Sequence, residues 1–195
     1  MRVGFVGSFK PWHGLGHLIK AAARVADRGI PVRLELMGEG PERVRLEEQV
    51  RALGLAAHVR FLGAHPHEQV PAFLQSLDIA VAPAPSSEDF YFSPLKLFEY
   101  AAAGRAIIAP AAGQVPEWFE HGVDAWLVPP GDASALADAI ERLGEDPSLR
   151  SRLGASARAR AAREFDWSRV ADRILAWIRE PEVVGSATGA KGGSG

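Results

Sequence analysis

The sequence predicts an α/β domain built on a six-stranded parallel sheet with helices on both faces. Short apolar segments rich in Val, Ile and Leu alternate with longer segments whose apolar residues recur at helical spacing. Strands that alternate with helices pair in parallel. The strand segments are nearly continuous apolar runs, which is typical of a sheet buried on both faces. We therefore expect a Rossmann-like domain of three layers.

Six apolar segments are the predicted strands. Each segment ends at Gly or Pro, residues that terminate strands and open turns. The segments are residues 2–7, 32–38, 59–63, 79–83, 106–110 and 125–129.

The predicted helices lie between and after these strands. Several begin at Pro and end at Gly, because Pro suits the first helical turn and Gly suits the left-handed residue that follows the last turn. The segments are residues 16–29, 41–54, 94–104, 133–143, 147–163 and 167–179.

Composition limits the functions to consider. The chain has 195 residues, 47% hydrophobic and 24% charged, which suits one domain with a sizeable core. A net charge of -2 gives no electrostatic reason to expect nucleic acid or a membrane surface as partner. The lack of cysteine excludes disulfides and thiolate metal ligands.

The chain ends suggest location and boundaries. The sequence has no apolar run of about 18 residues that could span a bilayer. The first residues lack the layout of a signal peptide, so we expect no transmembrane segment and a cytoplasmic location. We expect one domain over residues 1–180, and residues 181–195 are a low-complexity tail expected to be disordered.

The loops that follow the strands are the expected ligand site. Ligands of open parallel sheets bind beyond the carboxyl ends of the strands. Glycines near the helix starts in three of these loops allow backbone amides to approach an anion closely. The loops are residues 7–18, 38–42, 63–71 and 84–96.

Two charges in the helix expected at residues 94–104 occupy unusual positions. Lys96 falls in the first turn, where the helix dipole disfavours a cation, and Ser93 is a good N-cap for that turn. Glu99 lies among apolar residues, where partial burial requires a partner. A phosphate bound beyond the carboxyl ends of the strands would explain the position of Lys96 in the first turn. A bound ribose would explain the position of Glu99 among apolar residues. The alternative is a solvated ion pair of Lys96 with Glu99, three residues apart.

Other chemistries lack their motifs. His13 and His17 have the spacing of metal ligands on a helix, but glycines lie between them and no Glu follows His13. The sequence also lacks a G-x-S-x-G elbow, a P-loop and a G-x-G-x-x-G loop. We therefore expect no metal site, and hydride transfer and ATP hydrolysis lose support.

The order of several segments resembles a known family. SPLKLFEYAAAGRAIIA is followed by AAGQVPEWFEHGVDAWLVPPGD, and FVGSFKPWHG, GEGPERVRLEEQVRALGL and VRFLGAHPHEQVPAFL precede them. Together they resemble the C-terminal, donor-binding domain of retaining GT-B glycosyltransferases of the group 1 or family 4 type. The resemblance implies half of a GT-B fold that binds a nucleoside diphosphate sugar as co-substrate, without a metal or other cofactor.

The resemblance also implies roles for individual residues. Family members carry two glutamates separated by seven residues, of which the second corresponds to Glu99 and binds the ribose hydroxyls. Tyr91 occupies the position of the first, beside the transferred sugar, so the chain departs from the pattern there. The candidate catalytic residues are therefore Tyr91, Lys96 and Glu99. The segment that lies along the sugar and diphosphate is Phe92, Ser93, Pro94 and Leu95.

A second departure concerns the charges that neutralise phosphate. Ser8 and His13 stand where family members often have Arg and Lys. The loop still offers Lys10, His13 and the amides around Gly14, and our hypothesis is that Lys96 supplies the missing positive charge.

Two further matches are open to simpler interpretations. Gly38 and Gly40 match a glycine-rich turn near the nucleotide, yet an ordinary strand-to-helix turn explains them as well. His65 lies in a loop that resembles the part that cradles the base, yet it could be an ordinary loop residue.

The predicted function is the donor half of a retaining glycosyltransferase that acts on an unidentified acceptor. Activity would need an N-terminal acceptor domain or a separate partner chain. A non-catalytic module that binds nucleotide sugars, or a relative of GT-B epimerases, are the alternatives.

Overall fold

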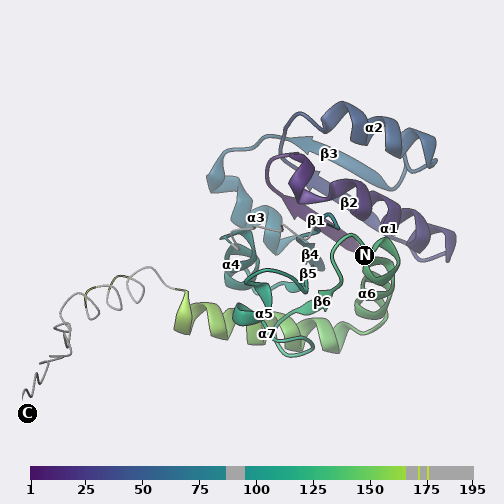
Figure 1. Cartoon of the computed structure of the whole chain (residues 1–195). Helices are drawn as coiled ribbons and strands as arrows, with labels where there is room; N and C mark the ends of the chain where they lie inside the picture. The colour runs from purple at the N-terminus through teal and green to yellow at the C-terminus, as the bar shows by residue number, and fades with distance from the viewer. Residues whose placement is uncertain (87–94, 166–170, 172–174, 176–195) are drawn as a thin grey trace, which may run out of the picture.

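One parallel sheet organises the residues that the computed structural model describes, which are 1–86, 95–165, 171 and 175 (Figure 1). The strand order is β3-β2-β1-β4-β5-β6, and all neighbours pair in parallel, which confirms the predicted sheet. The strands are β1 (Arg2–Val6), β2 (Arg33–Met37), β3 (Val59–Gly63), β4 (Ile79–Val81), β5 (Ala106–Pro110) and β6 (Trp126–Val128).

Seven α-helices lie among the described residues, with single turns of 3-10 helix at η1 (Pro11–His13) and η2 (His67–Gln69). They are α1 (Leu15–Asp27), α2 (Arg43–Ala52), α3 (Val70–Gln75), α4 (Leu95–Ala102), α5 (Val115–Trp118), α6 (Ala133–Glu145) and α7 (Pro147–Glu164). The predicted helix at residues 167–179 lies almost wholly outside the described residues, and so does the predicted tail at 181–195.

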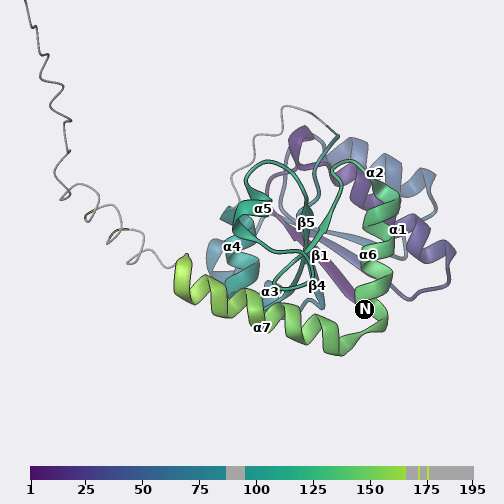
Figure 2. The same ribbon diagram turned by 60° about the horizontal axis from the view of Figure 1, so that its bottom comes forward.

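The helices divide into two layers with a core on each side of the sheet. One core joins residues of α1, α2 and α6 to the strands, and the other joins residues of α3 and α4 to the strands. Figure 2 shows α7 running from beside α6 to beside α4, and it contributes to both cores. The three expected layers are therefore present.

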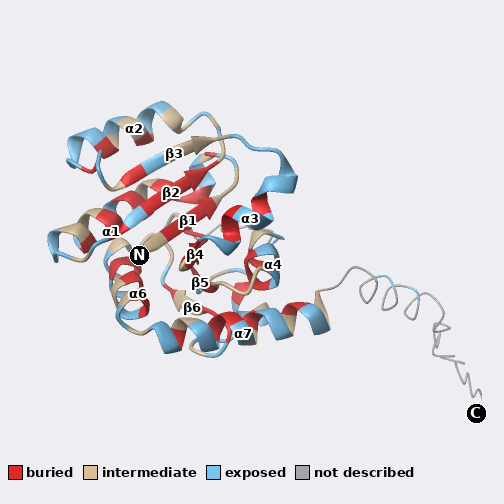
Figure 3. Cartoon of the chain, turned by 180° about the vertical axis from the view of Figure 1, so that it is seen from behind, coloured by how far each residue is buried: buried red, intermediate tan, exposed pale blue. Residues whose placement is uncertain are grey.

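Strand pleating explains how one short segment serves both cores. Along β5, Ala106 and Ile108 belong to the first core, whereas Ile107 and Ala109 belong to the second. Successive side chains of a strand point to opposite faces, so a sheet covered twice needs apolar residues at every position. Figure 3 shows this as nearly continuous burial along the central strands.

Helix α2 begins two residues later than Pro41, where the sequence placed its start. Pro41 and Glu42 lie in a turn, and α2 starts at Arg43. The backbone amide of Glu42 donates a hydrogen bond to the carbonyl of Phe9 at 3.1 Å, so this turn is tied to the neighbouring loop.

None of the described helices is long and apolar enough to cross a membrane.

Asp132 fixes the start of α6. Its Oδ1 accepts hydrogen bonds from the amides of Ser134 at 2.8 Å and Ala135 at 2.9 Å, which satisfies two donors that the first helical turn leaves without partners.

We predict that Asp132→Ala lowers the free energy of unfolding by about 1 kcal/mol, because those two amides lose their acceptor. Urea denaturation measures the change. Ser134→Ala, which alters an exposed side chain in the same turn, is the control and should leave stability nearly unchanged. Equal stability of Asp132→Ala and the wild type would contradict the capping role.

Candidate functional site

The candidate site lies where β1 and β4 part at their carboxyl ends. Pairing of β1 with β2 extends to Val6, but pairing of β1 with β4 ends at Gly4 and Ala80. The strand order reverses between β1 and β4, and in doubly wound sheets this switch point is where ligands bind. The loops after β1 and β4 therefore define the site.

Tyr100 closes the gap between these strands. Its hydroxyl oxygen accepts a hydrogen bond from the amide of Val6 at 3.0 Å, and its hydroxyl lies 3.5 Å from the carbonyl oxygen of the same residue. Complete burial raises the pKa of Tyr100 well above its ordinary value, so the phenol stays neutral and can donate. Helix α4 is thereby fixed to the end of β1.

Lys96 lies one turn before Tyr100, on the same face of α4. Its Nζ is 3.3 Å from Nδ1 of His13 and 4.2 Å from the centroid of the Phe5 ring, a cation–π distance. A side chain on Gly7 would begin 3.0 Å from Nζ, so the amine rests against the backbone at the end of β1. Burial lowers the pKa of Lys96 to about 7, although the charge of Glu99 opposes the decrease.

These contacts decide between the two interpretations of Lys96. The amine points inward to His13 and Phe5, not onto a solvated face as the surface ion pair requires. Partial burial of Glu99 was predicted from its apolar neighbours, and this prediction is wrong because Glu99 is exposed. The residues of α4 that face the core are Leu97, Tyr100 and Ala101, and position 99 falls on the opposite face.

Glu99 borders a groove between α3 and α4. The groove has a volume of about 240 Å³, and its other lining residues include His67, Val70 and Pro71 of the α3 region. An exposed carboxylate at such an edge can accept hydrogen bonds from the hydroxyls of a bound molecule.

His13 is buried beside Lys96. Its ring centroid lies 5.8 Å from that of Phe5 and 6.2 Å from that of Trp12. Burial, and then the charge of Lys96, lower the pKa of His13 to about 4, so the imidazole is neutral at physiological pH. On the same loop, Ser8 is exposed and Nζ of Lys10 lies 5.6 Å from the Trp12 ring.

The glycines of the predicted site allow the loops to pack against each other. A Cβ on Gly38 would lie 1.9 Å from the carbonyl oxygen of Gly7, and one on Gly40 would lie 2.6 Å from the backbone of Phe9. Gly14 has a φ of 63°, and its Cβ would lie 2.5 Å from the backbone of Ala84. Close packing of the backbones accounts for Gly38 and Gly40, and any contact of theirs with a nucleotide stays a prediction.

His65 is exposed, and contacts within its own loop hold it. Its Nε2 lies 3.1 Å from the Leu62 carbonyl and its Nδ1 lies 2.7 Å from Oε1 of Gln69. Four predicted residues, Tyr91, Phe92, Ser93 and Pro94, lie outside the described residues, and Leu95 is exposed at the start of α4.

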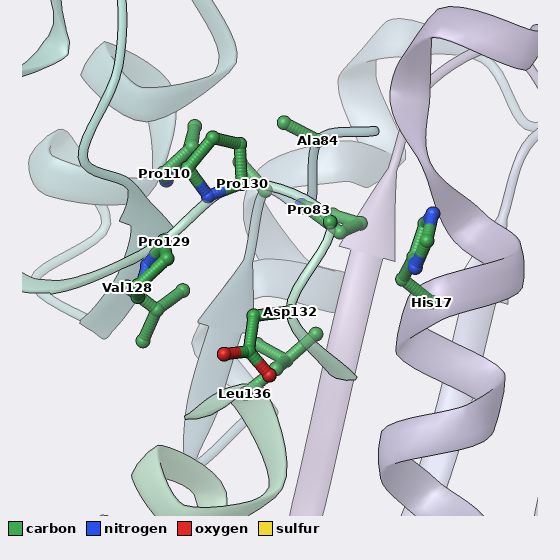
Figure 4. Close-up of a pocket in the computed structure, with 11 residues that line it drawn as sticks. His17, Pro83, Ala84, Pro110, Val128, Pro129, Pro130, Asp132 and Leu136 are labelled. Carbon is green, nitrogen blue, oxygen red and sulfur yellow. The ribbon is translucent and has the colours of Figure 1, made fainter. Parts of the chain in front are cut away.

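A second, smaller hollow was not anticipated from the sequence (Figure 4). Its volume of about 10 Å³ is close to that of one water-sized probe. His17 faces a wall of prolines across it, and Asp132 borders it while capping α6. The signal in the sequence is the Pro that ends three of the predicted strand segments, at Pro83, Pro110 and Pro129.

The chain is similar to known glycosyltransferases. Residues 2–160 match the family model described as glycosyl transferases group 1. Alpha-D-kanosaminyltransferase from Streptomyces kanamyceticus is 30% identical over 176 residues, covering 90% of this chain and 45% of that protein. Phosphatidyl-myo-inositol mannosyltransferase from Mycobacterium leprae is 36% identical over 174 residues, covering 88% of this chain and 44% of that protein.

A solved structure shares the fold. Alr3699/HepE from Anabaena, crystallised in complex with UDP-glucose, superposes with a TM-score of 0.80 and is 27% identical, covering 91% of this chain and 48% of that one. The chain thus spans about half the length of each of these three proteins.

We predict that Tyr100→Phe lowers the free energy of unfolding by about 1–3 kcal/mol, because the Val6 amide loses its acceptor at a part-buried position. Urea denaturation at constant m-value measures the loss. A midpoint equal to that of the wild type would mean that the amide finds another acceptor.

We predict that Lys96→Met stabilises the fold by roughly 3–5 kcal/mol near neutral pH, with a difference that disappears as the pH approaches about 10. The folded pKa of Lys96 is about 7 and its ordinary value is 10.5, so between these values the unfolded chain binds more protons than the folded chain. Wild-type stability therefore gains with rising pH in this interval, and the variant lacks this contribution.

Urea denaturation at several pH values tests this prediction. Lys20→Met, at an exposed position of α1, is the control and should not change the pH dependence. A difference between Lys96→Met and the wild type that does not vary with pH would show that burial of the amine does not destabilise the fold.

Proposed function

The chain belongs to the glycosyl transferases group 1 family, and we propose that it is the donor-binding half of a retaining glycosyltransferase. The donor would be a nucleoside diphosphate sugar bound across the carboxyl ends of β1 and β4. Acceptor contacts would come from a further domain or chain, since the similarity covers about half of each relative.

The observation that carries the proposal is the Lys96 amine at the switch point. A negative charge close to an amine that is largely withdrawn from water favours the charged form of that amine. A diphosphate beyond the end of β1 would be such an anion. The crystal structure of Alr3699/HepE with UDP-glucose supports this choice of ligand class, because its fold matches over 91% of this chain.

The proposed roles divide between two turns of α4. Lys96 would offset the charge of the diphosphate, and exposed Glu99, one turn further along, would accept hydrogen bonds from the ribose hydroxyls. The base would lie toward the η2 and α3 side of the groove that Glu99 borders. Roles for Tyr91, Ser93 and their neighbours stay predictions from the sequence.

In the proposed reaction, the bond between the anomeric carbon and the β-phosphate oxygen breaks. The acceptor oxygen forms its bond to the same face of that carbon, and its proton passes to the departing diphosphate. The protein would contribute by positioning the donor and stabilising the charge of the leaving group. A buried ammonium does both without rearrangement, because its contacts exist before the donor arrives.

Tyr91 favours a second candidate, a module that binds nucleotide sugars without transferring them. The family has a glutamate at this position, beside the transferred sugar. Transfer of the sugar to an acceptor would exclude the module, and interconversion of two sugars without an acceptor would indicate an epimerase relative.

We predict that one nucleoside diphosphate sugar raises the melting temperature of the chain, and that Glu99→Ala removes most of the increase. A ligand at about 100 times its Kd adds roughly 2.7 kcal/mol, or roughly 5–10 °C for a chain of this size. The measurement is thermal denaturation with UDP, GDP, ADP and their common sugar conjugates.

Glu48→Ala, at an exposed glutamate of α2 on the other layer, is the matched control and should keep the full increase. No shift with any of these nucleotides, for a chain that unfolds cooperatively, would refute donor binding by this domain. A shift that survives Glu99→Ala would refute the ribose contact alone.

A further inference from the structure

We propose that His13 is a positioning residue for the diphosphate of the donor. Its Nδ1 accepts a hydrogen bond from Lys96 and holds the ammonium over the carboxyl end of β1. The inference rests on the donor-binding function proposed above and names a residue through which that site works.

Within the part of the chain that the structure describes, three contacts position the Lys96 amine. Nζ of Lys96 lies 3.3 Å from Nδ1 of His13 and 4.2 Å from the centroid of the Phe5 ring. Gly7 leaves room for the amine, because a Cβ at that position would lie 3.0 Å from Nζ. An ammonium group can only donate hydrogen bonds, so Nδ1 is the acceptor and the imidazole carries its proton on Nε2. Of these contacts, the hydrogen bond to His13 is the directional one.

His13 is itself held in place from several sides. It closes the η1 turn, its amide donates to the Lys10 carbonyl at 3.0 Å, and its ring packs beside Phe5 and Trp12. Gly14, which follows it, packs directly on Ala84 of the loop after β4. A fixed imidazole can therefore orient the end of a long and otherwise mobile lysine side chain.

A neutral acceptor suits this position better than a second cation. A positive charge at the place of Nδ1 would repel the Lys96 ammonium at contact distance in a partly buried site. The neutral imidazole supports the charge without competing for the anion. The low pKa of His13, which results first from burial, agrees with that role.

Among the described residues, the titratable groups around Lys96 come from two elements. Glu99 and Tyr100 lie on α4 itself, and Lys10 and His13 lie on the loop after β1, where Lys10 is directed to Trp12. The neighbouring strand β4 has no titratable residue. Among these groups, Lys96 titrates near neutrality, so a bound diphosphate should raise its pKa and bind more weakly as pH increases above about 7.

The test compares His13→Asn with His13→Leu. Asn places an amide oxygen close to the position of Nδ1, whereas Leu fills the space with apolar atoms and offers no acceptor. We expect His13→Leu to weaken binding of UDP-glucose about tenfold, and His13→Asn to remain close to the wild type. A purely structural role would give the reverse order, because the core would prefer Leu. Isothermal titration calorimetry measures the affinities.

Further affinity measurements test whether His13 acts on diphosphate binding through Lys96. In a Lys96→Met background, His13→Leu should have no additional effect on the affinity, because the group that it positions is gone. Uridine, which has no phosphate, should bind all folded variants equally. UDP-glucose has no phosphate group that titrates near neutrality, so its affinity should fall above about pH 7 for the wild type and stay level for Lys96→Met.

Inorganic pyrophosphate is the probe that does not depend on the base. The inference is overturned if His13→Leu binds UDP-glucose and pyrophosphate as the wild type does, or if its effect is the same with and without Lys96. If UDP-glucose binds well but the variants do not differ, only the role of His13 is refuted. If the wild type binds neither pyrophosphate nor any nucleoside diphosphate sugar of the thermal-denaturation panel, both the inference and the proposed function are refuted.

Discussion

The parting of β1 and β4 is the constraint on which the site depends. The Val6 amide points to the side of β1 that faces β4, two positions beyond Gly4, where the pairing of these strands ends. A part-buried amide without a partner is unfavourable, and the Tyr100 hydroxyl provides that partner. This bond sets the position of α4 along β1. Because Lys96 precedes Tyr100 by four residues, it also determines where the Lys96 amine meets the sheet.

The buried position of Lys96 lowers the stability of the fold, and under the proposed function a bound diphosphate would offset that loss. Burial of Lys96 destabilises its charged form, and the charge of Glu99 offsets only part of that effect, as the pKa near 7 indicates. An apolar residue would suit the folded chain better.

Close backbone packing holds the loop after β1 against the loops after β2 and β4. The loop after β1 touches the loop after β2 at Gly7 and Gly38, and the loop after β4 at Gly14 and Ala84. A hydrogen bond of 2.8 Å from the Phe9 amide to the Glu39 carbonyl strengthens the first of these contacts. Groups on the loop after β1 lose little freedom when a ligand arrives, which lowers the entropic penalty of binding.

The sequence alone determined the strands and the parallel sheet, because apolar runs ending at Gly or Pro and helical spacing are local patterns. The order of several segments resembles the family whose model the chain matches. The sequence also directed attention to Lys96 and Glu99, whose charges conflict with their local surroundings. The tertiary structure decided what these charges do: Glu99 is exposed although its neighbours in sequence are apolar, and Lys96 meets His13, which is 83 residues away in the chain. Which face of α4 covers the sheet, and which loop packs beside it, depends on contacts between distant segments, and no local pattern encodes such contacts.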